Sequence, residues 1–322
     1  MLQGAIFYGD DMKKNDVITS TASGYGTEGE AVFVCDGTPV FVPFCMEGER
    51  AEIKILSVKG GAAYGKCEKL LSPSPERVLP QCPVFTKCGG CQLQHMNYAA
   101  QTAFKTSLVK NTLRKIAGIE AEVLPAYGGE KTYRYRNKLV LPVGRDGEGN
   151  TLIGFYAPRS HRIVPVSDCS IQSPWCAKVI AAVKEYMSVC KLSGYDEESG
   201  RGDIRRIAVR EVGGKFVVAL VAAKSVNAAP LADILQKELG EITLLLNINK
   251  STGNAVFGDD WSVVRGDGFF ESEDMGVKFR AGANTFLQVN DGVRTELYVE
   301  ISKEAADGGA VAIDLYSGGG ML

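Results

Sequence analysis

The first part of the chain alternates apolar and polar positions in short runs and shows no helical period. From about Val17 to Leu70, the stretches ITSTASGYGTEGEAVFVCDGTPVFVPF and RAEIKILSVKGGAAYGKCEKLL separate β-formers with glycine-rich turns. Roughly five short strands in so small a span predict a closed β-barrel of the OB type. The prolines of SPSPERVLP then predict an extended linker.

Helical and strand patterns follow one another in the remainder. NYAAQTAFKTSLVKNTLRKIAG has apolar residues near a 3.6 period, with Asn97 as the expected N-cap and Gly118 as the expected stop. Further helices are predicted in PWCAKVIAAVKEYMSVCKL, PLADILQKELG and, capped by Asn290, DGVRTELYVEISKEAA. Strands are predicted in TYRYRNKLVLPVG, TLIGFYAPRSHRIVPV, IRRIAVREV, KFVVALVAAK, ITLLLNINK, WSVVRGDGFFES and VKFRAGANTFLQV. The fold class is therefore a multi-domain α/β protein.

Composition narrows the classes of protein. The chain has 322 residues, 45% hydrophobic and 23% charged, as in an ordinary globular protein of two or three domains. Its net charge of −2 means that nucleic-acid binding would need local basic patches. The sequence contains no apolar run of the ~18 residues that a membrane span needs, and its start lacks the pattern of a signal peptide. We expect a cytoplasmic monomer with no membrane partner.

The stretch CPVFTKCGGCQLQH brings Cys82, Cys88 and Cys91 close together. In a reducing compartment, clustered cysteines are more often metal ligands than disulfides. A four-cysteine iron–sulfur cluster needs one more thiolate, for which Cys169, in a turn of PVSDCSIQSP, is the candidate. Zinc held by four thiolates is the alternative. The other cysteines are expected to be structural: Cys35, Cys45, Cys67, Cys176 and Cys190.

The end of the chain, AVAIDLYSGGG, reads as a buried-type strand, an acidic residue and a turn that includes Gly318. Such a turn lets the backbone approach a ligand at the carboxyl edge of a parallel sheet. The pattern is that of the first motif of S-adenosylmethionine methyltransferases, with a plain glycine turn as the alternative. Gln288, on a strand ahead of this turn, could reach such a cofactor or be an ordinary solvated side chain.

Basic and aromatic residues interleave in YRYRNK, where Arg134, Arg136 and Lys138 alternate with tyrosines. Phosphate neutralisation and base stacking use these residue types, although a solvated strand face gives the same pattern. His95 and His161 are expected to be structural histidines.

Taken together, these motifs resemble the bacterial RNA (uracil-5-)-methyltransferases. C-x5-C-G-G-C-x2-Q-H, the cysteine of SDC, YRN-K, F-x-Q-V-N and D-L-Y-x-G-x-G occur in the family's order. The resemblance implies a TRAM-like RNA-binding barrel at residues 10–72, a central α+β iron–sulfur domain at 73–272, and the start of a Rossmann-like methyltransferase domain at 273–322. It implies a [4Fe–4S] cluster and bound S-adenosylmethionine. The implied cluster ligands are Cys82, Cys88, Cys91 and Cys169, and the implied cofactor contacts are Gln288, Tyr316 and Gly318.

The resemblance also implies a transferase of class EC 2.1.1 that methylates C5 of a uridine in RNA. The barrel favours 23S ribosomal RNA, and transfer RNA at uridine 54 is one alternative. A non-catalytic iron–sulfur module that binds RNA is the other. In the family's chemistry a cysteine thiolate adds to C6 of the base. That nucleophile and the general base are expected beyond Leu322, so we expect a C-terminally truncated chain that is inactive by itself.

Overall fold

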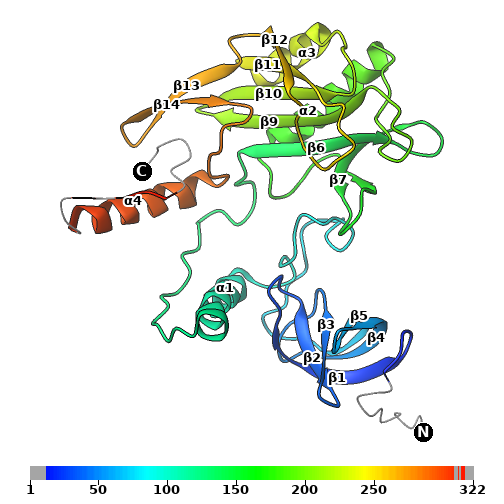
Figure 1. The fold of residues 1–322 in the computed structure, drawn as a ribbon, viewed down its shortest axis with the longest axis vertical. Helices are drawn as coiled ribbons and strands as arrows, with labels where there is room; N and C mark the ends of the chain where they lie inside the picture. The colour runs from blue at the N-terminus through cyan, green and yellow to red at the C-terminus, as the bar shows by residue number, and fades with distance from the viewer. Residues whose placement is uncertain (1–11, 308–310, 312, 316–322) are drawn as a thin grey trace. The chain divides into compact units, whose positions relative to one another are not determined.

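The computed structural model describes residues 12–307, 311 and 313–315 (Figure 1). The chain divides into two compact units, Met1–Gly128 (unit 1) and Gly129–Leu322 (unit 2). Each unit is described by itself. Within the described residues, no helix is long and apolar enough to cross a lipid bilayer.

Unit 1 begins with a closed five-stranded barrel in which the strands follow the order β1-β2-β3-β5-β4. Apolar residues point inward at alternate positions, so Phe33, Val40 and Ile53 are fully buried. The predicted OB-like barrel is confirmed. Its strands are β1 (Val17–Tyr25), β2 (Ala31–Cys35), β3 (Thr38–Val42), β4 (Arg50–Lys59) and β5 (Ala62–Ser72).

The helix that follows starts and stops where the sequence predicts. α1 (Tyr98–Thr112) begins after Asn97, whose Oδ1 accepts a hydrogen bond from the backbone N–H of Ala100 at 2.8 Å. A π-helical turn, η1 (Leu113–Ala117), continues it to Gly118 at φ 67°, in the left-handed region. Only Ala100 and Phe104 of α1 are buried, so α1 packs through its first two turns.

Unit 2 is built on a seven-stranded mixed sheet with the order β12-β11-β10-β9-β6-β7-β8. Helices α2 (Trp175–Val189) and α3 (Ala229–Leu239) pack on one face and form the main core with it. The predicted helices and the hairpin between β9 and β10 are confirmed. The strands are β6 (Lys138–Arg145), β7 (Thr151–Tyr156), β8 (Ile163–Pro165), β9 (Ile204–Val212), β10 (Lys215–Ala222), β11 (Ile242–Ile248) and β12 (Asp260–Arg265).

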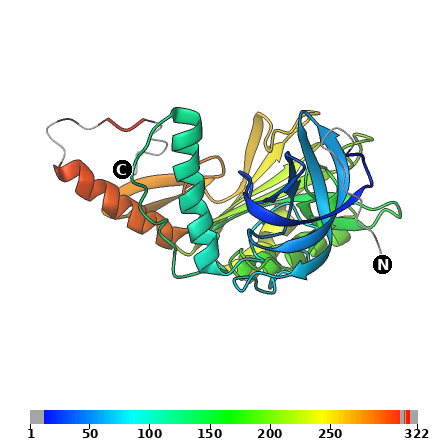
Figure 2. The same cartoon turned by 90° about the horizontal axis from the view of Figure 1, so that it is seen from below.

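A separate hairpin and a helix complete unit 2. β13 (Phe269–Asp274) pairs with β14 (Val277–Gly282), and α4 (Asp291–Asp307) lies beside this hairpin (Figures 1 and 2). Arg294 of α4 joins the two, because its Nη2 lies 2.5 Å from Oδ2 of Asp274. Asn290 caps α4 as predicted, with its Oδ1 accepting from the N–H of Val293 at 3.3 Å.

Three predicted strand segments differ in the structure. Residues 132–137 and 283–289 are loops, because most of their backbone hydrogen bonds go to other loops; the exception is the carbonyl of Asn137, which accepts from Glu211 of β9. In the last segment, the side chains of Val311, Ile313 and Leu315 are 81%, 81% and 78% exposed and not in a strand. A strand of this apolar type needs partners on both sides, and none of the described strands pairs with it.

Candidate functional site

The cysteine loop of unit 1 is a compact turn. Its backbone closes on itself, since the N–H of Cys88 donates to the carbonyl of Val84 at 2.8 Å. The N–H of Gly90 donates to Sγ of Cys88 at 3.3 Å. An amide aimed at sulfur favours the thiolate, which is the form that binds metals. Cys82, Cys88 and Cys91 are all half-buried, so the loop keeps its sulfur atoms near the surface.

The fourth predicted ligand, Cys169, belongs to unit 2. It is half-buried and packs against the main core of that unit. Three of the predicted thiols thus lie in one unit and one in the other. Across the described part of the chain, no three His, Cys, Asp or Glu side chains gather as a metal site would require. The four-thiolate set therefore stays a prediction.

The cysteine loop is fastened to the barrel through aromatic contacts. Phe85, inside the loop, packs edge-on against Phe44 of the barrel at 5.0 Å between ring centroids and lies 5.8 Å from the ring of His95. Nε2 of His95 lies 3.4 Å from the carbonyl oxygen of Cys45. His95 is thus a buried side chain that connects the barrel with the cysteine loop, in agreement with the structural role predicted for it.

The three predicted RNA-binding residues lie just before β6 and at its first position. Arg134 is paired with Asp168 at 2.6 Å and also donates to the carbonyl of Cys169 at 3.1 Å. The backbone of Arg136 bridges to Gln172 and to Asn290. Lys138 is half-buried, and burial, with the charges of Arg210 and Arg136, lowers its pKa.

Arg134 therefore positions the segment that carries Cys169. Its partner Asp168 was not predicted from the sequence. Arg136 and Arg210 lie close enough to Lys138 for their charges to lower its pKa. Their assignment to RNA stays a prediction.

Gln288 lies on the loop between β14 and α4, with an exposed side chain. Its main chain is held by Asn137, the residue just before β6. Nδ2 of Asn137 donates to the carbonyl of Gln288 at 3.1 Å and to Oδ1 of Asp291 at 2.7 Å. The N–H of Asn137 donates to the carbonyl of Val289 at 3.0 Å. Asn137 itself is 4% exposed, so this junction is built into the fold.

A second buried side chain holds the same loop. Arg210, on β9 and 2% exposed, directs Nη1 to the carbonyl of Leu287 at 3.4 Å and Nη2 to that of Thr285 at 3.2 Å. Burial lowers the pKa of Arg210, opposed by the charge of Asp291. Arg210 is not among the site residues predicted from the sequence. The feature of the sequence that could have identified it is an arginine within the apolar strand IRRIAVREV. A charged side chain on such a strand is expected to be buried only where it has a partner.

Arg210→Met is expected to release residues 285–288. The substitution keeps the side-chain volume but leaves two carbonyls without donors, at about 1–3 kcal/mol. Amide hydrogen exchange in this loop should speed up by roughly ten-fold or more. Arg280→Met, at an exposed arginine of the adjacent hairpin, is the matched control. Equal exchange in the two variants would show that Arg210 does not hold the loop.

Comparison with known proteins gives the family. No model of a protein family matches the chain. A Clostridium tetani protein described as an uncharacterized RNA methyltransferase is 36% identical over 318 residues, which are 97% of this chain and 69% of that protein. A Halalkalibacterium halodurans protein of the same description is also 36% identical with the same coverage.

A solved structure agrees in fold. The Pyrococcus abyssi tRNA (uracil-54, C5)-methyltransferase, in complex with S-adenosyl-L-homocysteine, matches with a TM-score of 0.70 and 25% identity. The match covers 93% of this chain and 68% of that one. With this fold, and with 36% identity to relatives along nearly all of its length, the chain belongs to the RNA methyltransferase family.

Proposed function

We propose that this protein acts in the S-adenosylmethionine-dependent methylation of a uridine at C5 in RNA. The observation that carries the proposal is the likeness over 93% of the chain to the Pyrococcus abyssi enzyme, a tRNA (uracil-54, C5)-methyltransferase in complex with S-adenosyl-L-homocysteine. Membership in the RNA methyltransferase family supports RNA as the substrate. The sequence motifs point to the same chemistry independently.

We propose two candidate RNA targets. The TRAM-like interpretation of the barrel favours 23S ribosomal RNA. The structural neighbour modifies transfer RNA, which supports uridine 54 of transfer RNA as the second candidate. The division into domains at 10–72, 73–272 and 273–322, the monomeric state and the cytoplasmic location belong to the same proposal.

The role proposed here for residues of this chain is to bind S-adenosylmethionine. S-adenosylmethionine supplies an electrophilic methyl group. We propose that Gln288 contacts it, since its side chain is exposed on a loop that Asn137 and Arg210 fix. Tyr316 and Gly318, the other predicted contacts, lie outside the described residues.

The chemistry that the family resemblance implies is covalent catalysis by a cysteine. A thiolate at C6 is needed to make C5 of uracil nucleophilic.

Mapping of 5-methyluridine tests the methylation. A strain without the gene should lose the modification from one uridine, in 23S ribosomal RNA or in transfer RNA, and the restored gene should return it. The affected molecule decides between the two targets. An unchanged map in both RNAs would contradict the proposed function.

We also propose that Cys82, Cys88, Cys91 and Cys169 hold a [4Fe–4S] cluster. A donor set made only of thiols suits iron–sulfur chemistry, and the amide of Gly90 aimed at Cys88 fits a thiolate there. The methyl transfer contains no redox step. The cluster would therefore have a structural role, tying the two segments of chain that supply its ligands.

Anaerobically purified protein should be brown, absorb near 400 nm and contain iron and sulfide in about equal amounts. Cys88→Ser and Cys169→Ser should each lower the iron content. Cys190→Ser, at the end of α2, is the control and should keep it. A colourless protein that contains zinc would contradict the cluster and favour the four-thiolate zinc site.

A further inference from the structure

The loop that carries Cys169, residues 168–173 (the Cys169 loop), lies between β8 and α2 in unit 2. Its far end is anchored, because Trp175 begins α2 and its Nε1 donates to Oε2 of Glu211 on β9 at 2.7 Å. Within the loop, the N–H of Gln172 donates to the carbonyl of Cys169 at 3.1 Å. The shape of the loop around Cys169 therefore depends on what holds its other backbone groups.

The segment just before β6 pairs with the Cys169 loop through the main chain. The N–H of Arg134 donates to the carbonyl of Ser170 at 2.9 Å, and the N–H of Arg136 donates to that of Ile171 at 3.0 Å. In the other direction, the N–H of Ser173 donates to the carbonyl of Arg136 at 3.2 Å. The two segments are thus joined along their length by hydrogen bonds of both polarities.

The side chain of Arg134 adds a second connection. Its Nη1 and Nη2 donate to the two carboxylate oxygens of Asp168 at 2.9 and 2.6 Å, the bidentate geometry that a guanidinium allows. Nη1 is also directed at the carbonyls of Cys169 at 3.1 Å and Gln172 at 3.4 Å. The two charged side chains are 40% and 37% exposed, so their attraction alone would contribute little. The fork geometry and the carbonyl contacts are what fix the loop.

The backbone of Arg134 is strained at this place. Its φ is 57°, in the left-handed region. An arginine is uncommon there because its Cβ crowds the backbone, and such a conformation persists only where surrounding contacts hold it. The N–H and the guanidinium of Arg134 both have their partners on the Cys169 loop. The conformations of Arg134 and of the loop therefore depend on each other.

The contacts of Arg134 suit this task better than a contact with RNA. A phosphate group would have to compete with the carboxylate of Asp168, which already takes both ends of the guanidinium fork. The negative charge of that carboxylate would also repel an approaching phosphate. The RNA-binding prediction for Arg134 is therefore weaker than the local role.

We propose that the Arg134–Asp168 pair holds the Cys169 loop in the shape that the cluster needs before iron binds, and that Arg134 serves this purpose instead of contacting RNA. The inference rests on the proposed cluster and adds the residues that prepare its fourth ligand. Cys169 is remote in sequence from the other three ligands, so the fold must present its thiol. Groups that orient a metal ligand raise metal affinity by about 10- to 100-fold. Arg134 is a positioning residue, since it acts through the loop.

Release of iron from the anaerobically purified 322-residue protein tests this, followed as the loss of absorbance near 400 nm in excess EDTA. Arg134→Asn removes the fork, while asparagine tolerates the left-handed backbone. It should release iron at least ten-fold faster than the parent protein. Arg134→Lys keeps the charge but cannot form the bidentate contact, so its rate should lie between the two.

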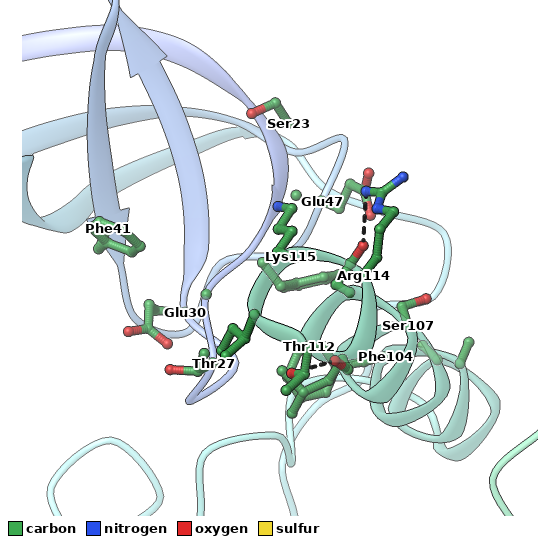
Figure 3. A pocket seen from close by; sticks show the side chains of 18 of the residues that line it. Ser23, Thr27, Glu30, Phe41, Glu47, Phe104, Ser107, Thr112, Arg114 and Lys115 are labelled. Carbon is green, nitrogen blue, oxygen red and sulfur yellow. Dashed lines mark hydrogen bonds between the residues drawn. The ribbon is translucent and has the colours of Figure 1, made fainter. Parts of the chain in front are cut away.

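Two arginines outside the loop are matched controls. Arg280, on β14, pairs with Glu271 at 3.0 Å. Arg114 lines a groove of about 960 Å³ between the barrel and the α1–η1 helix of unit 1, and its Nη2 donates to Oδ1 of Asn111 at 3.2 Å (Figure 3). Arg280→Asn and Arg114→Asn should each release iron within two-fold of the parent rate.

Amide hydrogen exchange separates positioning from a general loss of stability. In the iron-free protein, Arg134→Asn should speed up exchange at residues 168–173 and leave β10 and β11 unchanged. Where the protein binds RNA, the dependence of affinity on salt should be that of the parent, whereas a phosphate contact by Arg134 would lower the slope by about 0.7 on a single strand.

Iron release at the parent rate in Arg134→Asn would overturn the positioning role, and so would faster exchange throughout unit 2 or a lowered salt slope. A protein that holds no iron in any variant would contradict the proposed cluster itself and this role with it. The proposed methylation is judged separately, by the loss of 5-methyluridine in the deletion strain.

Discussion

Glu49→Gln is expected to destabilise unit 1 by about 3 kcal/mol, because it breaks a buried ion pair and leaves one charge without its partner. The carboxylate of Glu49 is fully buried. Nε and Nη2 of Arg77 approach its two oxygens at 2.5 and 2.6 Å. The backbone N–H groups of Met46 and Ser74 donate to the same carboxylate at 2.8 and 3.0 Å.

This clamp ties the linker after the barrel to the barrel itself. Arg77 also donates to the carbonyl of Phe44 at 2.8 Å, and Phe44 packs on the cysteine loop through Phe85. Losing the clamp should therefore loosen both the barrel edge and the loop that carries three of the predicted cluster ligands. Gln keeps one acceptor oxygen, but its NH2 group would face one backbone N–H and one N–H of Arg77, so the variant removes the charge and two of the four hydrogen bonds.

Both tryptophans, Trp175 and Trp261, belong to unit 2, so their fluorescence does not report on unit 1. Amide hydrogen exchange of the barrel strands is the suitable measurement, and 3 kcal/mol corresponds to an increase of roughly 150-fold. Glu68→Gln, which breaks the exposed pair with Lys66, is the control and should leave exchange unchanged. Equal effects of the two variants would contradict a special role for Glu49.

The local elements of this fold could be predicted because their causes are local. Alternating apolar positions gave the barrel strands, and Asn97 and Gly118 marked both ends of the first helix. The segments wrongly predicted as strands, 132–137 and 283–289, have β-forming residues as well. They bond mostly to one another and to neighbouring loops, and periodicity contains no information about such partners.

The contacts of the candidate site were less predictable, because they join residues that are far apart in the sequence. Gln288 was found by its motif, but the residues that hold its loop are 75 to 154 positions away in sequence. Arg77 and Glu49 are separated by 28 positions, and no spacing rule connects them. Buried polar side chains of this kind are recognised from the structure, where each donor can be matched to its acceptor.

His95 should make the stability of unit 1 depend on pH. Its side chain is 1% exposed, and burial, aided by the charge of Arg77, lowers its pKa to about 4, while the Cys45 carbonyl and Glu49 act in the opposite direction. Because the carbonyl of Cys45 only accepts, the neutral ring carries its hydrogen on Nε2. Nδ1 is buried and has no hydrogen-bond partner among the residues that the structure describes, so a proton added there would gain no hydrogen bond from them.

The sign follows from proton counting. In the unfolded chain the imidazole titrates near 6.5, and in the fold near 4. Between these values the unfolded state binds a proton that the folded state does not, so stability falls as the pH falls. The contribution is complete above pH 6.5 and declines by up to about 3 kcal/mol towards pH 4. The lowered pKa of Glu49 adds a loss only below its ordinary value of 4.5.

His95→Gln should therefore flatten the pH dependence of barrel hydrogen exchange between pH 6.5 and 4.5, because glutamine does not titrate. The sequence has only two histidines, which makes His161→Gln, at an exposed position of unit 2, the matched control that keeps the slope. Proton NMR of the two imidazoles measures the cause directly, with the His95 signal expected to titrate near pH 4. Titration of that signal near pH 6.5 would contradict a buried, neutral His95. An unchanged pH dependence of barrel hydrogen exchange in His95→Gln would contradict it as well.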